Sequence, residues 1–251
     1  IHFYYQNAGG IRTRLNEFCL GVNASVYDVI IITETWLYDK ISDPELLLRN
    51  YNIFRADRNI NTSTKLRGGG VLVAVNKAFN SSIVMYGQNV ESVYVRINTN
   101  KLSLIVGGVY IPPASDIHVY SDHCSELESV YQRFPNCDYI IAGDFNLPFL
   151  IWDRNKITNR LVGSSKDCYD VLISTYSFLS LDQVNTIPNN RNVFLDLIFS
   201  NITNLQVNAA VDTIFDNSVH HISYSWSLPN FCVSVLSSEI EIFDFANGNY
   251  H

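Results

Sequence analysis

Short apolar runs recur along most of the chain, and each has the length of a β-strand. Many of them are apolar at successive positions, where a half-exposed strand would alternate, so we expect sheets that are covered on both faces. The predicted strands span residues 1–5, 29–33, 70–75, 92–97, 102–110, 139–143, 194–199 and 222–226.

Three segments between these runs have the spacing of amphipathic helices: 12–20, 122–134 and 167–176. The triplet Ser121-Asp122-His123 resembles a compact catalytic Asp–His pair. It lies where the second helix is expected to begin, and Ser and Asp are typical helix caps. We therefore interpret the triplet as a cap.

The predicted strands outnumber the helices and lack the strict alternation of a parallel α/β sheet. The simplest architecture is an α+β sandwich in four layers (α/β/β/α), with two mixed sheets face to face and helices outside. The chain of 251 residues fits one large domain, which we assign to residues 1–228. The pattern is lost from about Pro229, so 229–251 is predicted to be a tail or linker.

Composition excludes several classes of protein. No apolar run approaches the ~20 residues of a membrane helix, so no membrane partner is expected. The five cysteines are odd in number, scattered and without a C-x-x-C pair, so we expect no disulfide partner, no structural zinc and a reducing intracellular compartment. The net charge of −7 argues mildly against a nucleic-acid partner, which is usually bound by basic proteins.

Polar residues at strand ends are the candidate chemistry, because rigid scaffolds carry active sites there. Asn7 follows the first strand and offers both a donor and an acceptor. Glu34 follows the buried run 29–32, where a carboxylate is costly unless it is paired or binds a metal. The alternatives are an ordinary strand-to-helix turn at Asn7 and an exposed loop Glu34.

Two further strand ends carry stronger candidates. In the segment GDFNLP at 143–148, Asp144 and Asn146 are two residues apart and therefore project to the same side of an extended chain. Together they can orient a water molecule and bind a phosphate oxygen. Tyr110 ends another strand before Pro112-Pro113, where it serves either packing or chemistry.

An aspartate within an apolar strand completes the set. Asp196 lies in the run 194–199 and needs a partner, and the His220-His221 pair supplies an imidazole. An Asp–His pair is suited to acid–base chemistry and phosphate binding, although each residue alone could be a satisfied core group.

Taken in order, these motifs resemble the endonuclease/exonuclease/phosphatase superfamily. More narrowly, they are similar to the apurinic-like endonuclease domain of non-LTR (LINE-type) retrotransposon polyproteins. The similarity covers residues 1 to about 228, and the stretch 243–250 is similar to the segment that precedes the reverse transcriptase in such polyproteins. The matching segments are QNAGGIRTR at 6–14, TETWL at 33–37, RGGGVLVAV at 67–75, YIPP at 110–113, GDFNLP at 143–148, and QVN at 183–185 through Asn189 to LDL at 195–197.

The resemblance implies a deoxyribonuclease-like fold and a role for each candidate. Glu34 would be the principal ligand of Mg²⁺ (or of Mn²⁺), with Asn7 beside it. Asp144 would orient or deprotonate water, and Asn146 would hold a phosphate oxygen. Tyr110 would support the scissile phosphate. Asp196 would fix a histidine that contacts the same phosphate, and this histidine is His221 or alternatively His220.

The implied reaction is Mg²⁺-dependent nicking of double-stranded DNA by water, which leaves a 3′-hydroxyl and primes reverse transcription. The implied partners are double-stranded DNA and a reverse transcriptase domain in the same polyprotein, acting in the nucleus. One motif departs from the family pattern, because Ser218 occupies the position at which related sequences have an Asp before two histidines. The alternatives are therefore a catalytically impaired DNA-binding domain and a related phosphoesterase.

Two predicted loops, 55–67 and 152–166, hold eight of the 17 basic residues: Arg55, Arg58, Lys65, Arg67, Arg154, Lys156, Arg160 and Lys166. We expect these loops to line a DNA-facing rim on the same side as Asp144, so that local positive charge offsets the acidic total. The predicted DNA-binding residues are Arg55, Arg58, Lys65, Arg67, Arg154 and Lys156, and the family resemblance adds Asn185 and Asn189.

Overall fold

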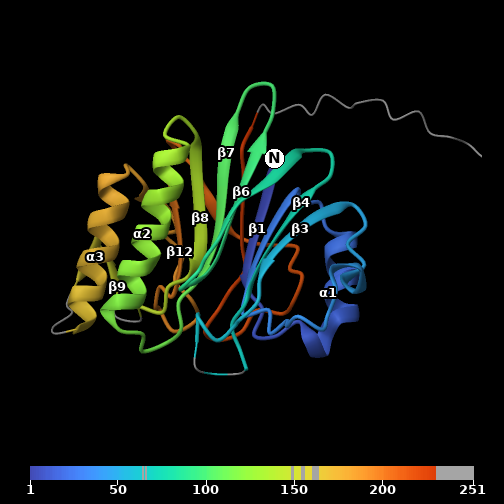
Figure 1. Cartoon of the computed structure of the whole chain (residues 1–251), viewed down its shortest axis with the longest axis horizontal. Coiled ribbons are helices and arrows are strands. Elements are labelled where there is room, and N and C mark those ends of the chain that lie inside the picture. The colour runs from blue at the N-terminus through green and yellow to red at the C-terminus, as the bar shows by residue number, and fades with distance from the viewer. Residues whose placement is uncertain (64, 66, 148–149, 154–155, 160–163, 230–251) are drawn as a thin grey trace, which may run out of the picture.

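The computed structural model describes residues 1–63, 65, 67–147, 150–153, 156–159 and 164–229, with the backbone alone at 150–153, 156–159 and 164–165. Two six-stranded mixed sheets pack face to face, and helices cover their outer faces (Figure 1). The predicted four-layer α+β sandwich is confirmed. Of the predicted tail, residues 230–251 lie outside the described residues.

The first sheet has the order β13-β14-β1-β2-β4-β3, in which only β1 and β2 are parallel neighbours. Every residue of β2 is buried, as expected for a central strand covered on both faces. The bounds are β1 (His2–Asn7), β2 (Val29–Thr33), β3 (Tyr51–Ala56), β4 (Val71–Asn76), β13 (Val207–Ala209) and β14 (Tyr224–Ser227).

The second sheet has the order β11-β12-β8-β7-β6-β5, in which only β7 and β8 are parallel neighbours. A separate hairpin, β9–β10, follows β8 in the chain. The bounds are β5 (Asn80–Tyr86), β6 (Glu91–Asn98), β7 (Ser103–Tyr110), β8 (Asp138–Asp144), β9 (Leu150–Asp153), β10 (Lys156–Asn159), β11 (Asp182–Gln183) and β12 (Asp196–Ser200).

The three predicted helices are present, and two of them begin earlier in the chain than the pattern indicated. Helix α1 (Leu15–Ala24) follows a short turn η1 (Arg12–Arg14) and packs on the first sheet, while a second turn, η2 (Asp43–Leu46), precedes β3. Helices α2 (Ile117–Arg133) and α3 (Ser164–Phe178) pack on the second sheet, on the left in Figure 1.

The predicted cap at Ser121-Asp122-His123 is wrong. Asp116 caps α2 instead, because its Oδ1 accepts hydrogen bonds from the amides of His118 and Val119 at 2.9 and 3.4 Å. His123 lies inside the helix, is fully buried, and has its Nε2 2.8 Å from the Tyr176 hydroxyl of α3. It is therefore a core residue rather than a catalytic one.

Cover on both sides explains why most strands are apolar on both faces: the two sheets cover each other's inner faces, and the helices cover the outer faces. Phe3 and Ile31 of the first sheet share one buried layer with Val95 and Val106 of the second. At Gly108, a Cβ atom would lie 2.7 Å from Cγ1 of Val71 across the interface. Glycine is needed there because any side chain would push the sheets apart.

Four of the cysteines, Cys19, Cys124, Cys137 and Cys168, are buried and free, and Cys232 lies outside the described residues. No helix in the part of the chain that the structure describes is long and apolar enough to cross a membrane.

Candidate active site

Strand register brings the predicted residues to one edge of both sheets. In the second sheet Tyr110 pairs with Asp144, and Asp144 pairs with Asp196. In the first sheet Asn7, at the end of β1, pairs with Thr33, and Glu34 is the next residue. Candidates that are far apart in the sequence are therefore neighbours, because the parallel pairs β1–β2 and β7–β8 end at this edge and the antiparallel strand β12 begins there.

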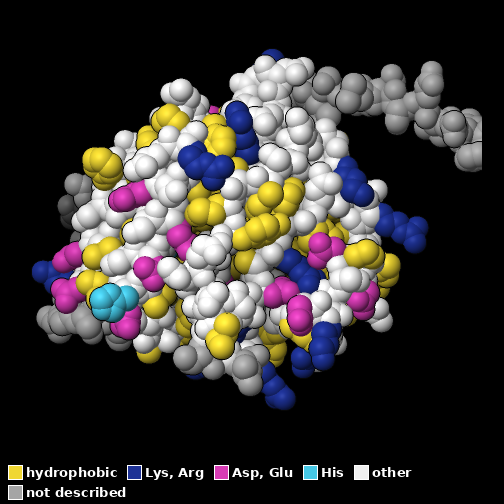
Figure 2. All heavy atoms as spheres, viewed as in Figure 1, with side chains coloured by type: hydrophobic (Ala, Val, Ile, Leu, Met, Phe, Trp, Pro, Cys, Tyr) yellow, Lys and Arg dark blue, Asp and Glu magenta, His cyan; other side chains and the backbone are white. Residues whose placement is uncertain are grey.

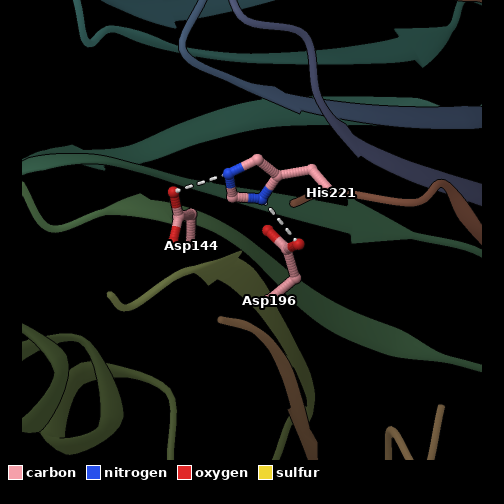
Figure 3. A group of neighbouring side chains, drawn as sticks. All are labelled: Asp144, Asp196 and His221. Carbon is pink, nitrogen blue, oxygen red and sulfur yellow. Dashed lines mark hydrogen bonds and ion pairs between the residues drawn. The ribbon is translucent and has the colours of Figure 1, made fainter. Parts of the chain in front are cut away.

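Asp144, Asp196 and His221 form the centre of the site (Figure 3). The imidazole lies between the two carboxylates, with Nδ1 2.9 Å from Asp196 Oδ2 and Nε2 3.9 Å from Asp144 Oδ2. One ligand atom from each of the three residues lies within 4.8 Å of the others. Both carboxylates are almost fully buried, so their charges act on the imidazole with little screening.

Asp196 is held from two sides. The hydroxyl of Tyr5 donates to Oδ1 at 2.7 Å, and His221 Nδ1 donates to Oδ2. Burial raises the pKa of Tyr5 well above its usual value, and the nearby carboxylates raise it further, so the hydroxyl keeps its proton and remains a donor. Tyr5 was not among the predicted residues, and its only signal in the sequence is its place on the inward face of the first strand.

The two carboxylates control the charge of the histidine. Burial opposes the imidazolium, but Asp196, Asp144 and Glu34 outweigh this effect and raise the pKa of His221 to about 9. Burial and the charge of Asp196 raise the pKa of Asp144 above its ordinary value, while His221 opposes the rise. At neutral pH the histidine is therefore positively charged beside a carboxylate that accepts a proton readily.

Two amide groups, one from a side chain and one from the backbone, orient Asp144. Asn7 Nδ2 donates to Oδ2 at 2.9 Å, and the backbone amide of Asn146 donates to Oδ1 at 3.2 Å. The Asn146 side chain is itself tied to the carbonyl oxygen of Ile111 at 2.9 Å, and its backbone has φ +48°. A non-glycine residue in this region is uncommon and marks a constrained position.

Glu34 follows β2 with φ +53° and lies between Tyr110 and a glycine loop. Its Oε2 accepts hydrogen bonds from the backbone amide of Gly69 at 2.8 Å and from the indole of Trp36. Burial raises the pKa of Tyr110, and the charge of Glu34 and a hydrogen bond to it raise this pKa further. Glu34 and Tyr110, one from each sheet, are therefore in contact.

A buried ion pair supports the glycine loop at Gly68–Gly70. Arg58 Nε lies 2.6 Å from Glu91 Oε1, and both side chains are more than 90% buried. Glu91 also accepts the amide of Gly70 at 2.6 Å, while Arg58 donates to the carbonyl of Arg67 at 2.7 Å. A Cβ atom at Gly69 would overlap both charged groups, and its φ of +67° also favours glycine. The pair thus positions the loop that holds Glu34, and Glu91 was not among the predicted residues.

Half of the predicted DNA-binding residues have internal partners. Arg58 is committed to Glu91, and Arg55 forms ion pairs with Asp43 and Asp57 at 3.3 and 3.0 Å. Asn185 Nδ2 donates to the carbonyl of Asp196, and Asn189 Nδ2 donates to the carbonyl of His220. These four side chains therefore form contacts within the protein that stabilise the walls of the site, whereas the prediction placed them on a DNA-facing rim.

Lys65 and Arg67 are exposed on the loop between β3 and β4, which leaves the sheet at the same edge as Glu34. Arg154 and Arg160 lie outside the described residues, as does the side chain of Lys156 in β10. On the face shown in Figure 2, Lys and Arg are scattered among Asp and Glu, without one dominant basic field.

The loop 218–221 distinguishes the two histidines. Ser218 Oγ accepts hydrogen bonds from the amides of His220 at 3.2 Å and His221 at 2.9 Å. The resulting turn directs His221 toward Asp196, whereas His220 is exposed. The serine therefore has a structural role at the position of the expected acid, and His221 is the histidine in the site.

The donors fit a divalent metal ion. The edge carries the carboxylates of Glu34 and Asp144 and the amide of Asn7, and oxygen donors of this kind are preferred by Mg²⁺. Among the described residues, Asp144, Asp196 and His221 form a group whose ligand atoms lie within 4.8 Å of one another and could hold such an ion. Both carboxylates of this group already accept hydrogen bonds, and the histidine nitrogen is a poorer ligand than oxygen for Mg²⁺.

A family model described as the endonuclease/exonuclease/phosphatase family matches residues 5–214, which span every residue of this site except His221. The chain belongs to the endonuclease/exonuclease/phosphatase family. Members of this family are hydrolytic nucleases or phosphatases. No curated protein matches the chain in sequence.

Solved structures show the same fold at low identity. The endonuclease domain of TRAS1, a telomere-specific non-LTR retrotransposon, has a TM-score of 0.62 at 14% identity, over 91% of this chain and 99% of that one. The AP endonuclease LMAP from Leishmania major has a TM-score of 0.66 at 12% identity, over 90% and 86%. The 3′ phosphatase NExo from Neisseria, bound to a product DNA hairpin, has a TM-score of 0.60 at 11% identity, over 90% and 98%.

Proposed function

We propose that this domain is a Mg²⁺-dependent endonuclease that nicks double-stranded DNA and leaves a 3′-hydroxyl, as used to prime reverse transcription at a retrotransposon target site. The observation that carries the proposal is the buried Asp144–His221–Asp196 arrangement beside Asn7 and Glu34. Two of the similar structures are named as endonucleases, one of them from a retrotransposon.

In the proposed reaction, water attacks the phosphorus in line with the leaving 3′ oxygen. Asp144 orients the water and accepts its proton, for which a raised pKa is suited because proton acceptance then matches the working pH. Asn146 and Tyr110 hold phosphate oxygens. The bond between phosphorus and the 3′ oxygen breaks, and the 3′ oxygen gains a proton to become the hydroxyl.

His221 acts as a cation against the phosphate. Asp196 holds its Nδ1, so that Nε2 faces the substrate side next to Asp144. A fixed positive charge stabilises the negative charge that develops on the phosphate oxygens. Glu34 and Asn7 would hold the Mg²⁺ ion (or Mn²⁺), which supplies Lewis-acid stabilisation of the same charge.

Plasmid nicking in Mg²⁺ tests the proposal, with the wild type compared with Asp144→Ala and Glu34→Ala. We expect nicking by the wild type, loss in both variants, and loss on removal of Mg²⁺ with a chelator. The exposed control variant His118→Ala, on α2, should nick like the wild type. Equal nicking by wild type and both site variants, or none by any protein, would refute the assignment.

A second candidate is a catalytically impaired DNA-binding domain, and Ser218 is the observation that favours it. The residues directly before His221 supply no carboxylate. Ser218→Asp distinguishes the two functions: a large gain in nicking indicates an impaired enzyme, whereas unchanged weak nicking with firm DNA binding indicates a binding role. Hydrolysis of 3′-phosphates or small phosphate esters in preference to DNA would point to a related phosphoesterase.

The proposed partners follow from the same assignment. Double-stranded DNA would contact Lys65 and Arg67, the exposed basic residues on the site edge, and Arg154 and Lys156 remain proposed contacts. A reverse transcriptase domain in the same polyprotein and action in the nucleus are part of the proposal. Sequencing of the parent gene beyond this chain tests the first of these directly.

A further inference from the structure

Two aromatic side chains are exposed immediately beside Glu34. Trp36 is 44% exposed and Tyr38 39% exposed, while Leu37 between them is buried. Both rings therefore face solvent from one short segment, and residues two apart have Cα atoms at most about 7 Å from each other. The other exposed large aromatic side chains among the described residues, Tyr86 and Phe178, lie on other elements, β5 and α3.

The indole is held in place rather than loosely exposed. Trp36 has φ +55°, a conformation that a bulky residue rarely adopts, and its backbone amide donates to the carbonyl of Gly69 at 2.9 Å. Its ring packs so closely on Gly10 that a Cβ there would lie 2.7 Å from Cε3. Its indole nitrogen donates to Glu34. Strain of this kind persists where the surroundings enforce it, and it often serves a ligand site.

Positive charge accompanies the rings. The Arg12 guanidinium lies over Tyr38, 5.7 Å from the ring centroid, and the Arg12 side chain is exposed. An exposed guanidinium over one exposed aromatic ring, with a second exposed ring two residues away in the chain, complements a ligand that combines flat rings with negative charge. A nucleic-acid strand has this chemistry, since its bases stack on aromatic side chains and its phosphates attract arginine.

We propose that Trp36, Tyr38 and Arg12 form a stacking platform for unpaired nucleotides next to the scissile phosphate. Inside a continuous duplex both faces of every base are covered by neighbouring bases, so surface aromatics can stack only on bases that are unpaired or splayed out. The proposal rests on the proposed nuclease function and deepens it. The preferred substrate is a DNA with unpaired bases at the cleavage point, such as a bubble or a flap junction, over an uninterrupted duplex.

Binding without cleavage tests the platform. A fluorescent duplex and the same duplex with a short unpaired bubble are titrated in EDTA, where no Mg²⁺ supports hydrolysis, and anisotropy gives both affinities. We expect the wild type to bind the bubble about 10-fold more tightly, which is within the range for one stacked base. Trp36→Ala and Tyr38→Ala should each remove most of this preference, whereas Trp36→Phe should retain it.

Phe178→Ala is the matched control, because it removes a ring that is 82% exposed on α3 and should leave both affinities unchanged. Circular dichroism checks folding, and Tyr38→Ala carries the test if Trp36→Ala does not fold. Equal affinity of the wild type for both DNAs, or an unchanged preference in both alanine variants, overturns the platform. Plasmid nicking by wild type but not by Asp144→Ala would then still support the nuclease assignment, so the two failures are distinguishable.

Discussion

At the scale of single residues, the positions of His220 and His221 predict that alanine substitution slows catalysis at His221 and has little effect at His220. His221→Ala removes the cation between Asp144 and Asp196, and acid–base and electrostatic roles of this kind contribute about 10²- to 10⁴-fold. We therefore expect a loss of that size in the rate of plasmid nicking.

His220→Ala provides the neighbouring control, because the His220 side chain is exposed and only its backbone carbonyl accepts from Asn189. Its nicking rate should stay within about threefold of the wild type, as expected for a group outside the reacting centre. A larger loss of nicking in His220→Ala than in His221→Ala would show that His220, and not His221, is the histidine that acts in catalysis.

A second residue-scale prediction concerns stability at low pH. Burial lowers the pKa of His123 to about 3, from 6.5 in an unfolded chain. Below pH 6.5 the unfolded chain binds a proton that the folded protein does not, so stability falls as the pH falls. When the pH is lowered from 7.5 to 5.0, the free energy of unfolding should therefore fall by about 2 kcal/mol because of His123.

Urea unfolding at the two pH values measures this difference. The variant His123→Gln, whose amide does not titrate, should lose about 2 kcal/mol less than the wild type over the same interval. His118→Gln, at an exposed position on the same helix, should keep the wild-type dependence. An identical pH dependence in all three proteins would contradict a buried neutral His123.

At the scale of elements, the Arg58–Glu91 pair couples β6 to the glycine loop that holds Glu34. Removal of one partner leaves a buried charge alone, which typically costs about 3–5 kcal/mol of unfolding free energy. Arg58→Ala and Glu91→Ala should each reach this cost, and the double variant should cost less than their sum. Denaturant unfolding of all four proteins completes the cycle.

The same variants should bind the metal more weakly, since supporting contacts of a ligand are worth about 10-fold or more in metal affinity. We expect the Mg²⁺ concentration for half-maximal nicking to rise by about 10-fold in Glu91→Ala. Arg67→Ala, which removes an exposed arginine of the same loop, should not change it. An unchanged Mg²⁺ dependence in Glu91→Ala would show that the Arg58–Glu91 pair does not support metal binding by Glu34.

Elements also differ in how far their sequence predicts them. All eight predicted strands exist, because their side chains are buried on both faces and leave a continuous apolar run. Six described strands were missed: β3, β5, β9, β10, β11 and β13. Four of them, β3, β5, β11 and β13, lie at sheet edges, and in β3 and β5 half-exposed residues such as Asn52, Arg55 and Ser81 interrupt the apolar pattern.

At the scale of the whole molecule, the net charge of −7 limits DNA affinity. Among the described members of the predicted rim, the exposed basic residues are Lys65, Arg67 and Lys166, and Lys166 Nζ lies 4.0 Å from Asp170 Oδ2. With about two to four phosphate contacts, the logarithm of affinity should fall with the logarithm of salt at a slope of about −2 to −4.

Anisotropy titrations with a continuous duplex across a range of KCl concentrations give this slope, and Lys65→Ala should make it shallower by about 1. His118→Ala should leave the slope unchanged. A slope of about −8 in the wild type would require an extended basic surface elsewhere on the chain.

The sequence by itself determined the local features of this protein. Apolar runs predicted the sandwich, and polar groups directly after those runs marked Asn7, Glu34 and Asp144, because a strand and its exit are set by residues adjacent in the chain. The tertiary structure decided the rest. Tyr5 meets Asp196 across 191 positions, and Arg58 is buried against Glu91 across 33. Such contacts depend on strand register and sheet packing, which no local pattern encodes, and the same packing selects His221 over His220.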